Sequence, residues 1–208
     1  MSDLPLLSFD QLLEVYFDRP GVEAELARRH GATLAVLVVD FTGMVARTHA
    51  HGIGHALALA AAAQRAVAPV AADQGGALVK QVADTSFYVF DAPRSALLAA
   101  LDAQRALAAF AADHPAARGH GHAHGPLRGC MGLGFGPCLF LSGRDAFGEE
   151  VNRAFVLGED VARGGEVLAT DAFLAALGPL PEGVGAFRGP ADRAQEAGFP
   201  FQVLGDYR

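Results

Sequence analysis

The sequence contains no apolar run long enough to cross a membrane. Its longest clean apolar run, Ala56–Ala63, is followed directly by Gln64 and Arg65, whereas a membrane-spanning helix needs about 20 such residues. The first ten residues, MSDLPLLSFD, carry no basic stretch ahead of an apolar segment, so we expect no signal peptide. These absences predict a cytoplasmic protein that does not bind membranes.

An excess of positive charge is also missing. The formal net charge is −7, whereas proteins that bind nucleic acids or anionic membranes need a basic surface. We therefore expect neither nucleic acid nor membrane among the partners.

Cysteine is scarce. The chain has two cysteines, Cys130 and Cys138, within a glycine-rich segment. In a reducing compartment they are expected to be small buried apolar residues on neighbouring strands, with a disulfide as the alternative.

The length of 208 residues suits one domain with an appendage, and we find no internal repeat. Residues 1–31 are expected to form a helical appendage, in which Leu12, Leu13, Tyr16 and Phe17 fall on one helical face and a second short helix begins at Pro20. Residues 32–208 form the main domain.

The order of predicted elements in the main domain indicates an α+β fold. A β-branched and leucine-rich run at 33–40 predicts a central strand, and an alanine-rich segment up to about 72 predicts a helix. Asp91 is expected to cap the helix that ends near 114, and Thr170 a short helix. The other predicted strands are 77–82, 86–90, 130–135, 138–142, 166–169, 183–188 and 200–205, with a further helix at 149–163. This is a ferredoxin-like βαββαβ palm (an α/β sandwich) with extra C-terminal strands.

Two aspartates are expected to meet in this palm. Its first and third strands are antiparallel neighbours, so Asp40, which closes the first, should face Asp84, which opens the third. Two carboxylates at one strand end suit Mg²⁺ or Mn²⁺, which complete their shells with substrate phosphates. The alternative for each aspartate is a structural one, at a strand end or in a turn.

Three segments resemble the catalytic domains of class III adenylate and guanylate cyclases. They are VLVVDFTG, VKQVADTSFYVF and DAFGEEVNRA, which follow the order and spacing of that family. The resemblance covers roughly residues 33–205.

The resemblance implies a role for each matching residue. Asp40 and Asp84 would bind two metal ions, and the backbone of Phe41, Thr42 and Gly43 would lie against the triphosphate. An ammonium and a carboxylate match adenine N1 and its amino group. Because the guanylate-type sites of the family have other residues at these positions, the resemblance favours ATP over GTP. The purine would be read by Lys80 and Asp145, the ribose oriented by Asn152, and each site shared by two subunits, which implies a homodimer.

One residue of the family pattern is absent. The arginine that stabilises charge on the α-phosphate should stand one helical turn after Asn152, where this chain has Val156. Arg153 points about 100° away around the helix, and Arg163 lies too far along the axis. Comparable arginines contribute roughly 10³–10⁵ in rate. The glycine usual before the second metal aspartate is Ala83, and a basic residue is missing from the next strand region, where Cys130 and Pro137 occupy the candidate positions.

The sequence therefore predicts a cyclase-like domain that binds ATP and metal but has weak or lost turnover. The alternative is an active adenylate cyclase that forms cyclic AMP, with a substitute group or as half of a heterodimer that receives an arginine from its partner. A diguanylate cyclase is disfavoured, because VADTS lacks the Gly-Gly-acidic turn of those enzymes.

The histidines suggest a rival metal site. With His114, the alternating histidines of one loop (His120, His122 and His124) could bind Zn²⁺ or Ni²⁺, although a flexible polar loop is the simpler interpretation. His49, His51 and His55 are expected to be surface or packing residues.

Overall fold

The computed structural model describes residues 7–118, 125–141 and 144–206. One mixed sheet runs through it, in the strand order β2-β3-β1-β4-β6-β8-β7, with β5 paired to β4 at the side. The strands are β1 (Gly31–Phe41), β2 (Ala77–Val82), β3 (Thr85–Phe90), β4 (Gly129–Leu141), β5 (Asp145–Phe147), β6 (Val167–Thr170), β7 (Val184–Arg188) and β8 (Phe201–Asp206). The predicted α+β class and palm order are confirmed.

The central strand β1 is antiparallel to both of its neighbours. Val39 lies opposite Ser86 of β3, and Asp40 lies opposite Cys130 of β4. The end of β1 therefore meets the start of β3, as the sequence predicted.

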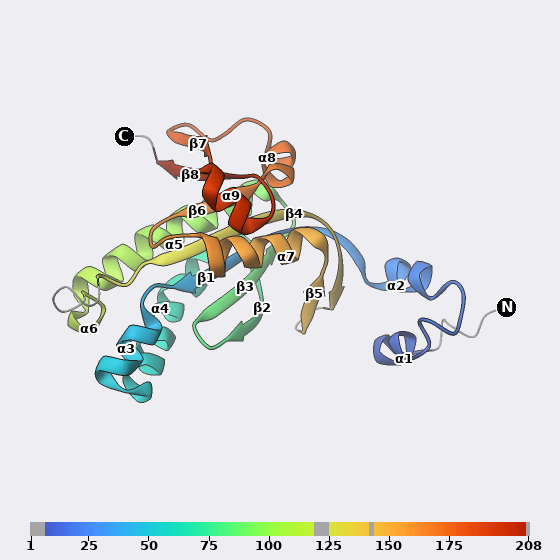
Figure 1. The fold of residues 1–208 in the computed structure, drawn as a ribbon, viewed down its shortest axis with the longest axis horizontal. Coiled ribbons are helices and arrows are strands. Elements are labelled where there is room, and N and C mark those ends of the chain that lie inside the picture. Colours follow the sequence, from blue (N-terminus) through green and yellow to red (C-terminus); the bar gives the residue numbers. More distant parts are fainter. Residues whose placement is uncertain (1–6, 119–124, 142–143, 207–208) are drawn as a thin grey trace.

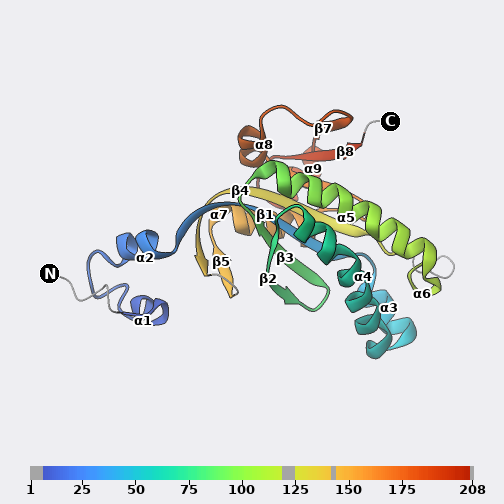
Figure 2. The ribbon, with the colours of Figure 1, turned by 180° about the vertical axis from the view of Figure 1, so that it is seen from behind.

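Helices cover both faces of the sheet (Figures 1 and 2). Behind it lie α4 (Ile53–Asp73) and α5 (Pro93–Asp113), with α3 (Met44–His51) and α6 (Pro115–Arg118) at one end. On the other face lies α7 (Glu149–Phe155), which continues into a π-helical turn, η3 (Val156–Val161). The expected single helix up to residue 72 is in fact two, because Gly52 adopts φ 85° and ψ 161° between α3 and α4. The N-cap of α5 is Ala92 rather than Asp91.

Although the sequence has no uninterrupted apolar run of that length, the two long helices α4 and α5 are each long and apolar enough to cross a membrane by length and composition. Each nevertheless buries one face in the main core against the sheet, through residues such as Leu59, Val67, Leu97 and Leu107. Amphipathic packing of this kind is what a core helix of a globular domain does.

The strand β4 differs most from expectation. The two strands expected at 130–135 and 138–142 are one continuous strand of 13 residues. Two of its glycines lie within the strand, directly under α7, and do not form a turn. A Cβ on Gly132 would lie 2.0 Å from the Ala154 carbonyl oxygen, and one on Gly134 would lie 2.3 Å from that of Glu150. The absence of side chains lets the helix backbone lie directly on the strand.

The N-terminal helices α1 (Phe9–Glu14) and α2 (Val22–His30) form a separate arm beside β5 (Figure 1). Leu12, Val22 and Leu26 make a small core with Leu139 of β4. The predicted common face is wrong beyond Leu12, because α1 ends at Glu14 and Phe17 is 94% exposed.

The C-terminal part adds β7 and β8 to the sheet together with α8 (Asp171–Leu177) and α9 (Ala191–Ala197). Thr170 caps α8, as predicted, by accepting a hydrogen bond from the Phe173 N–H. Neither α9 nor β5 was expected from the sequence.

Candidate functional site

Asp40 and Asp84 lie at the same end of the β1–β3 pair. Asp40, the last residue but one of β1, is half-buried, and its Oδ1 accepts a hydrogen bond from Thr85 Oγ1 at 3.3 Å. Burial, chiefly, and the negative charge of Asp84 raise the pKa of Asp40 to about 6. Two carboxylates that repel each other in this way favour the uptake of a cation.

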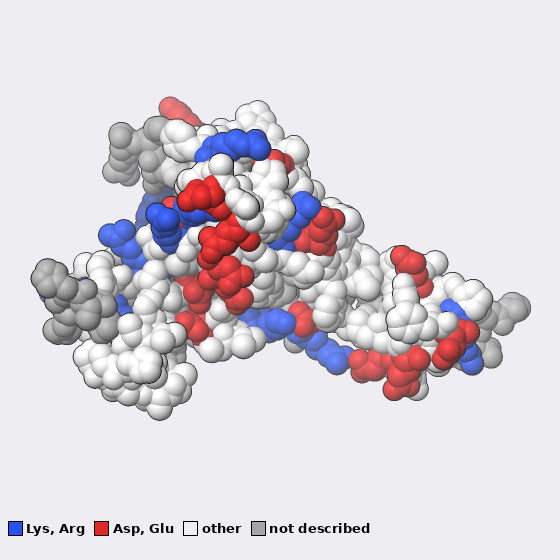
Figure 3. All heavy atoms as spheres, in the orientation of Figure 1, with Lys and Arg blue, Asp and Glu red and all other residues white. Residues whose placement is uncertain are grey.

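A third carboxylate contributes to the same field. Glu159 lies in η3 and is exposed, and its charge also raises the pKa of Asp40. Acidic side chains gather over η3 and the adjoining end of the sheet (Figure 3). Sequence reasoning missed Glu159, because a π-helical turn has no clear sequence signal. The one sequence feature that could have suggested a close approach of this turn to β1 is Gly158. A Cβ at this position would lie 3.1 Å from Val38 Cγ1.

The turn that carries Asp84 has an unusual backbone. Ala83 has φ 52° and is the one non-glycine residue with positive φ in the described chain. Its carbonyl oxygen accepts a hydrogen bond from Gln64 Nε2 at 3.3 Å. The cyclase family has glycine at the position of Ala83. The left-handed backbone conformation found there is one that favours glycine.

The segment Phe41–Gly43 joins the end of β1 to α3. Gly43 is the N-cap residue of α3, with φ 72°. The Thr42 N–H donates to the Arg128 carbonyl oxygen at 3.0 Å, and the Arg128 N–H donates to Thr42 Oγ1 at 3.0 Å. These two bonds fix the segment against the start of β4.

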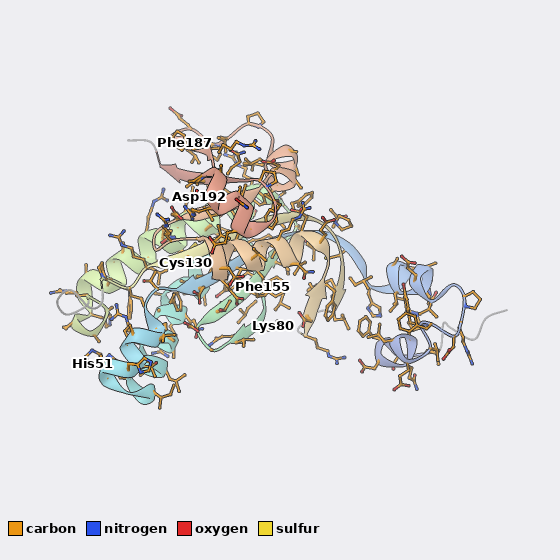
Figure 4. All side chains as sticks on the ribbon, viewed as in Figure 1. His51, Lys80, Cys130, Phe155, Phe187 and Asp192 are labelled. Atoms are coloured by element: carbon orange, nitrogen blue, oxygen red, sulfur yellow. The ribbon has the colours of Figure 1, made fainter. Side chains whose placement is uncertain are left out.

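Lys80 of β2 and Asp145 of β5 form an ion pair, with Nζ and Oδ2 2.7 Å apart. Both side chains are partly exposed, at 35% and 28%, and Lys80 lies at the edge of the sheet away from α5 (Figure 4). The structure therefore brings these two predicted site residues together.

Asn152 and Val156 both lie on the α7–η3 helix. Asn152 is exposed. Val156 is half-buried and packs against an apolar cluster that includes Leu157, Val161 and Phe201. One helical turn after Asn152, the chain therefore has an aliphatic side chain, Val156, which packs against this apolar cluster.

Arg153 is occupied elsewhere. Its guanidinium contacts Glu149 and Glu150, the latter at 3.0 Å, and lies 5.2 Å from the ring centre of Phe199.

Cys130 stands at one of the two candidate positions for the basic residue of the cyclase pattern. Its side chain is buried on β4 opposite Asp40, and burial, Asp40 and Glu166 raise the pKa of the thiol to about 12. It is therefore a neutral thiol. Cys130 and Cys138 are both free, which excludes the disulfide, but they lie on one strand rather than on neighbouring strands.

The histidines form no metal centre in the described part of the chain. No group of three or more His, Cys, Asp or Glu residues there is arranged to hold a metal ion. His51 and His55 lie beside each other where α3 meets α4, with ring centres 4.8 Å apart. His120, His122 and His124 lie outside the described residues.

Comparison with known proteins finds neither a matching family model nor a matching curated protein. Solved structures do match. An adenylate/guanylate cyclase/hydrolase from Silicibacter pomeroyi is 21% identical with a TM-score of 0.68, over 86% of this chain and 98% of that one. The adenylyl cyclase CyaB from P. aeruginosa is 19% identical with a TM-score of 0.64, over 86% and 96%.

A third similar structure is the non-canonical dimeric guanylyl cyclase domain of the RhoGC fusion protein from the aquatic fungus Blastocladiella emersonii. It is 12% identical with a TM-score of 0.64, over 86% of this chain and 98% of that one. At such identities the likeness shows the fold, which is that of class III adenylate/guanylate cyclase catalytic domains.

Proposed function

We propose that this chain, which has the class III nucleotide cyclase fold, is a cytoplasmic ATP-binding domain that works with Mg²⁺ or Mn²⁺ between two copies of itself and has weak or lost cyclase turnover. The single observation that carries the proposal is the ion pair of Lys80 and Asp145. These residues are far apart in sequence and lie in two different motifs, yet their charged groups lie 2.7 Å apart, as one purine-reading pair requires.

The residues at the end of β1 fit a divalent metal ion. Asp40 and Asp84 supply hard oxygen ligands, and burial of Asp40, together with the negative charge of Asp84, raises the pKa of Asp40. When bound, the metal would neutralise phosphate charge and polarise the reacting oxygens.

Each protein group has a distinct task in this proposal. Lys80 donates to, and Asp145 accepts from, the purine edge, once the nucleotide has displaced their contact with each other. Gly43 lets the backbone approach the triphosphate, since no Cβ stands in the way. Exposed Asn152 orients the ribose, in the site that its own chain forms with the partner's aspartates.

Turnover is expected to be low because of Val156. As the ribose 3′-oxygen attacks the α-phosphorus and pyrophosphate leaves, negative charge grows on the phosphoryl oxygens. Val156 offers that charge no donor, and Arg153 is held by two glutamates and a phenylalanine ring. Binding in the ground state suffers less, because the purine readers and metal ligands remain.

An active adenylate cyclase is the second candidate. It is favoured by the retention of the other site residues, with Asn152 exposed and the Lys80–Asp145 pair formed. In that case the missing arginine would come from a different chain in a heterodimer.

The test combines binding and turnover in one sample. ATP is added with Mn²⁺, and binding is followed by calorimetry and cyclic AMP by chromatography. Val156→Arg is expected to raise turnover at least tenfold, while Val156→Gln, a polar variant without the charge, leaves it unchanged. If both variants match the parent, the assignment of lost turnover to this position is wrong.

A further inference from the structure

A cavity lies between α5 and the segment that leads into β4. Neither Asp40 nor Asp84 lines it. Its volume is about 670 Å³, which is within the range of sites for small organic ligands. The floor is apolar, formed by Leu107 and Leu127 together with the alanines 108, 111 and 112 of α5. Such a wall favours a hydrocarbon body.

Two arginines and one further polar side chain, Gln104, line this largely apolar cavity. Arg118 of α6 and Arg128 before β4 both contribute to the lining, and no acidic residue does so among the described residues. A guanidinium provides several fixed N–H donors that match carboxylate or phosphate oxygens. The lining therefore combines a positively charged part with an apolar one.

Neither guanidinium is neutralised by a described residue. Arg118 donates to the Ala112 carbonyl oxygen through Nε, at 2.7 Å, and also through Nη2, which holds the side chain against α5 without cancelling its charge. Arg128 has no side-chain hydrogen bond or ion pair in the part of the chain that the structure describes; its Nη1 lies 3.5 Å from where a Cβ on Gly165 would stand. Both cations are thus available to an anion.

We propose that this cavity binds a small amphipathic anion, in which a carboxylate or phosphate head contacts Arg118 and Arg128 and an apolar body lies on the alanine face of α5. A cationic or neutral amphiphile of the same length lacks the complementary charge. The shared chemistry is that of a medium-chain fatty acid and of an alkyl phosphate.

The cavity wall is also joined to the segment Phe41–Gly43. The Arg128 backbone exchanges two hydrogen bonds with Thr42, each 3.0 Å long. An anion that repositions Arg128 therefore acts on the segment proposed to lie against the triphosphate. This coupling, unlike anion binding itself, rests on the proposed function.

The test measures binding of decanoate to the full chain by equilibrium dialysis without nucleotide. We expect saturable 1:1 binding of decanoate and of decyl phosphate, with decyltrimethylammonium at least tenfold weaker. Arg128→Gln should weaken decanoate binding about tenfold, the loss of one charge-assisted hydrogen bond. The control Arg94→Gln alters an exposed arginine at the other end of α5 and should leave binding unchanged.

A second variant tests the apolar body. Ala108 is exposed at the cavity wall, so Ala108→Phe fills space without disturbing the core, and it should abolish decanoate binding while circular dichroism and melting temperature stay unchanged. Equal binding of the anionic and cationic amphiphiles, or decanoate binding that survives both Arg128→Gln and Ala108→Phe, would overturn the site.

The coupling is read separately, as a shift in ATP affinity at saturating decanoate. A shift that Arg128→Gln removes supports the coupling, and unchanged ATP affinity overturns it. A protein that binds decanoate but no ATP would refute the proposed function and leave the anion site standing.

Discussion

Lys80 Nζ and Asp145 Oδ2 lie 2.7 Å apart and join the outer part of the sheet at β2 to the short strand β5. Partly exposed ion pairs contribute only about 0–1 kcal/mol to stability. The stability that this pair gives the folded domain is therefore small, and the proposed function assigns the pair to the binding of the purine.

Lys80 is the only lysine of the chain, which makes it a selective reporter. We expect ATP with Mn²⁺ to protect Lys80 from acylation by an amine-reactive ester, measured by mass spectrometry of the peptide that contains it. Asp145→Asn should speed acylation without nucleotide and reduce the protection by ATP about tenfold, because one charge-assisted hydrogen bond to the purine is lost. The N-terminal amine is the internal control, and equal labelling with and without ATP would contradict the assignment of Lys80.

Asp40 gives the protein a defined dependence on pH. Its pKa is raised from 3.8 to about 6, so between about pH 4 and 6 the folded chain holds a proton that the unfolded chain has released. Folding stability without metal should therefore fall as pH rises through this interval. Asp40→Asn should remove that fall in chemical denaturation measured at pH 4.5 and pH 7.5.

The same carboxyl group links metal binding to protons. Because the ligand form is the carboxylate, the affinity for Mn²⁺ should weaken as pH is lowered through about 6. Asp40→Asn should bind Mn²⁺ poorly at every pH, as judged by the lack of a rise in melting temperature on adding the ion. An affinity independent of pH from 5 to 8 would place the metal elsewhere.

The turn before Asp84 should be improved by glycine. Ala83 has φ 52°, and an L-residue in this region costs about 1 kcal/mol or more. Ala83→Gly is expected to raise the free energy of unfolding by about 0.5–1 kcal/mol in urea titration, after allowance for the extra freedom of the unfolded chain. As a matched control, Ala72→Gly at an exposed position of α4 should lower it by a similar amount.

The contact of α7 with β4 should not tolerate a methyl group. A Cβ on Gly134 would lie 2.3 Å from the Glu150 carbonyl oxygen, and the obstacle is backbone that cannot rotate away. Gly134→Ala is expected to lower the melting temperature by about 6–12 °C, corresponding to an overpacking cost of about 3 kcal/mol. Gly54→Ala, where nothing lies within 4 Å, is the control and should be neutral or stabilising.

The meeting of Asp40 with Asp84 could be predicted because it follows from topology alone. A buried strand, a helix and a β-hairpin in that order place strands one and three side by side. The glycines of β4 were harder to interpret, since a glycine in a strand can mark a bend or a close approach by another backbone, and the sequence pattern is the same for both. The close approach is decided by α7, whose contacting residues Glu150 and Ala154 lie 16 and 22 residues after Gly134 and Gly132.

The η3 turn was beyond the reach of sequence patterns. A straight α-helix over 149–163 accounts for the apolar spacing almost as well as α7 followed by a π-helical turn. Because each π turn adds a residue, the two alternatives differ in where Glu159 points, and only the structure places its charge within the field of Asp40. The place of Val156, in contrast, could be predicted, since it depends on one regular turn after Asn152; its effect on turnover stays a prediction.

The glycine contact between α7 and β4 has a consequence for motion. A helix whose backbone lies against a strand, and whose buried Glu150 also accepts hydrogen bonds from Thr170 of β6 and from the Phe135 N–H, has no room to slide or tilt. Asn152 is therefore fixed relative to the sheet of its own chain. If the site is assembled from two chains, its opening and closing must be a rotation of one rigid subunit against the other, and the hinge is the interface itself.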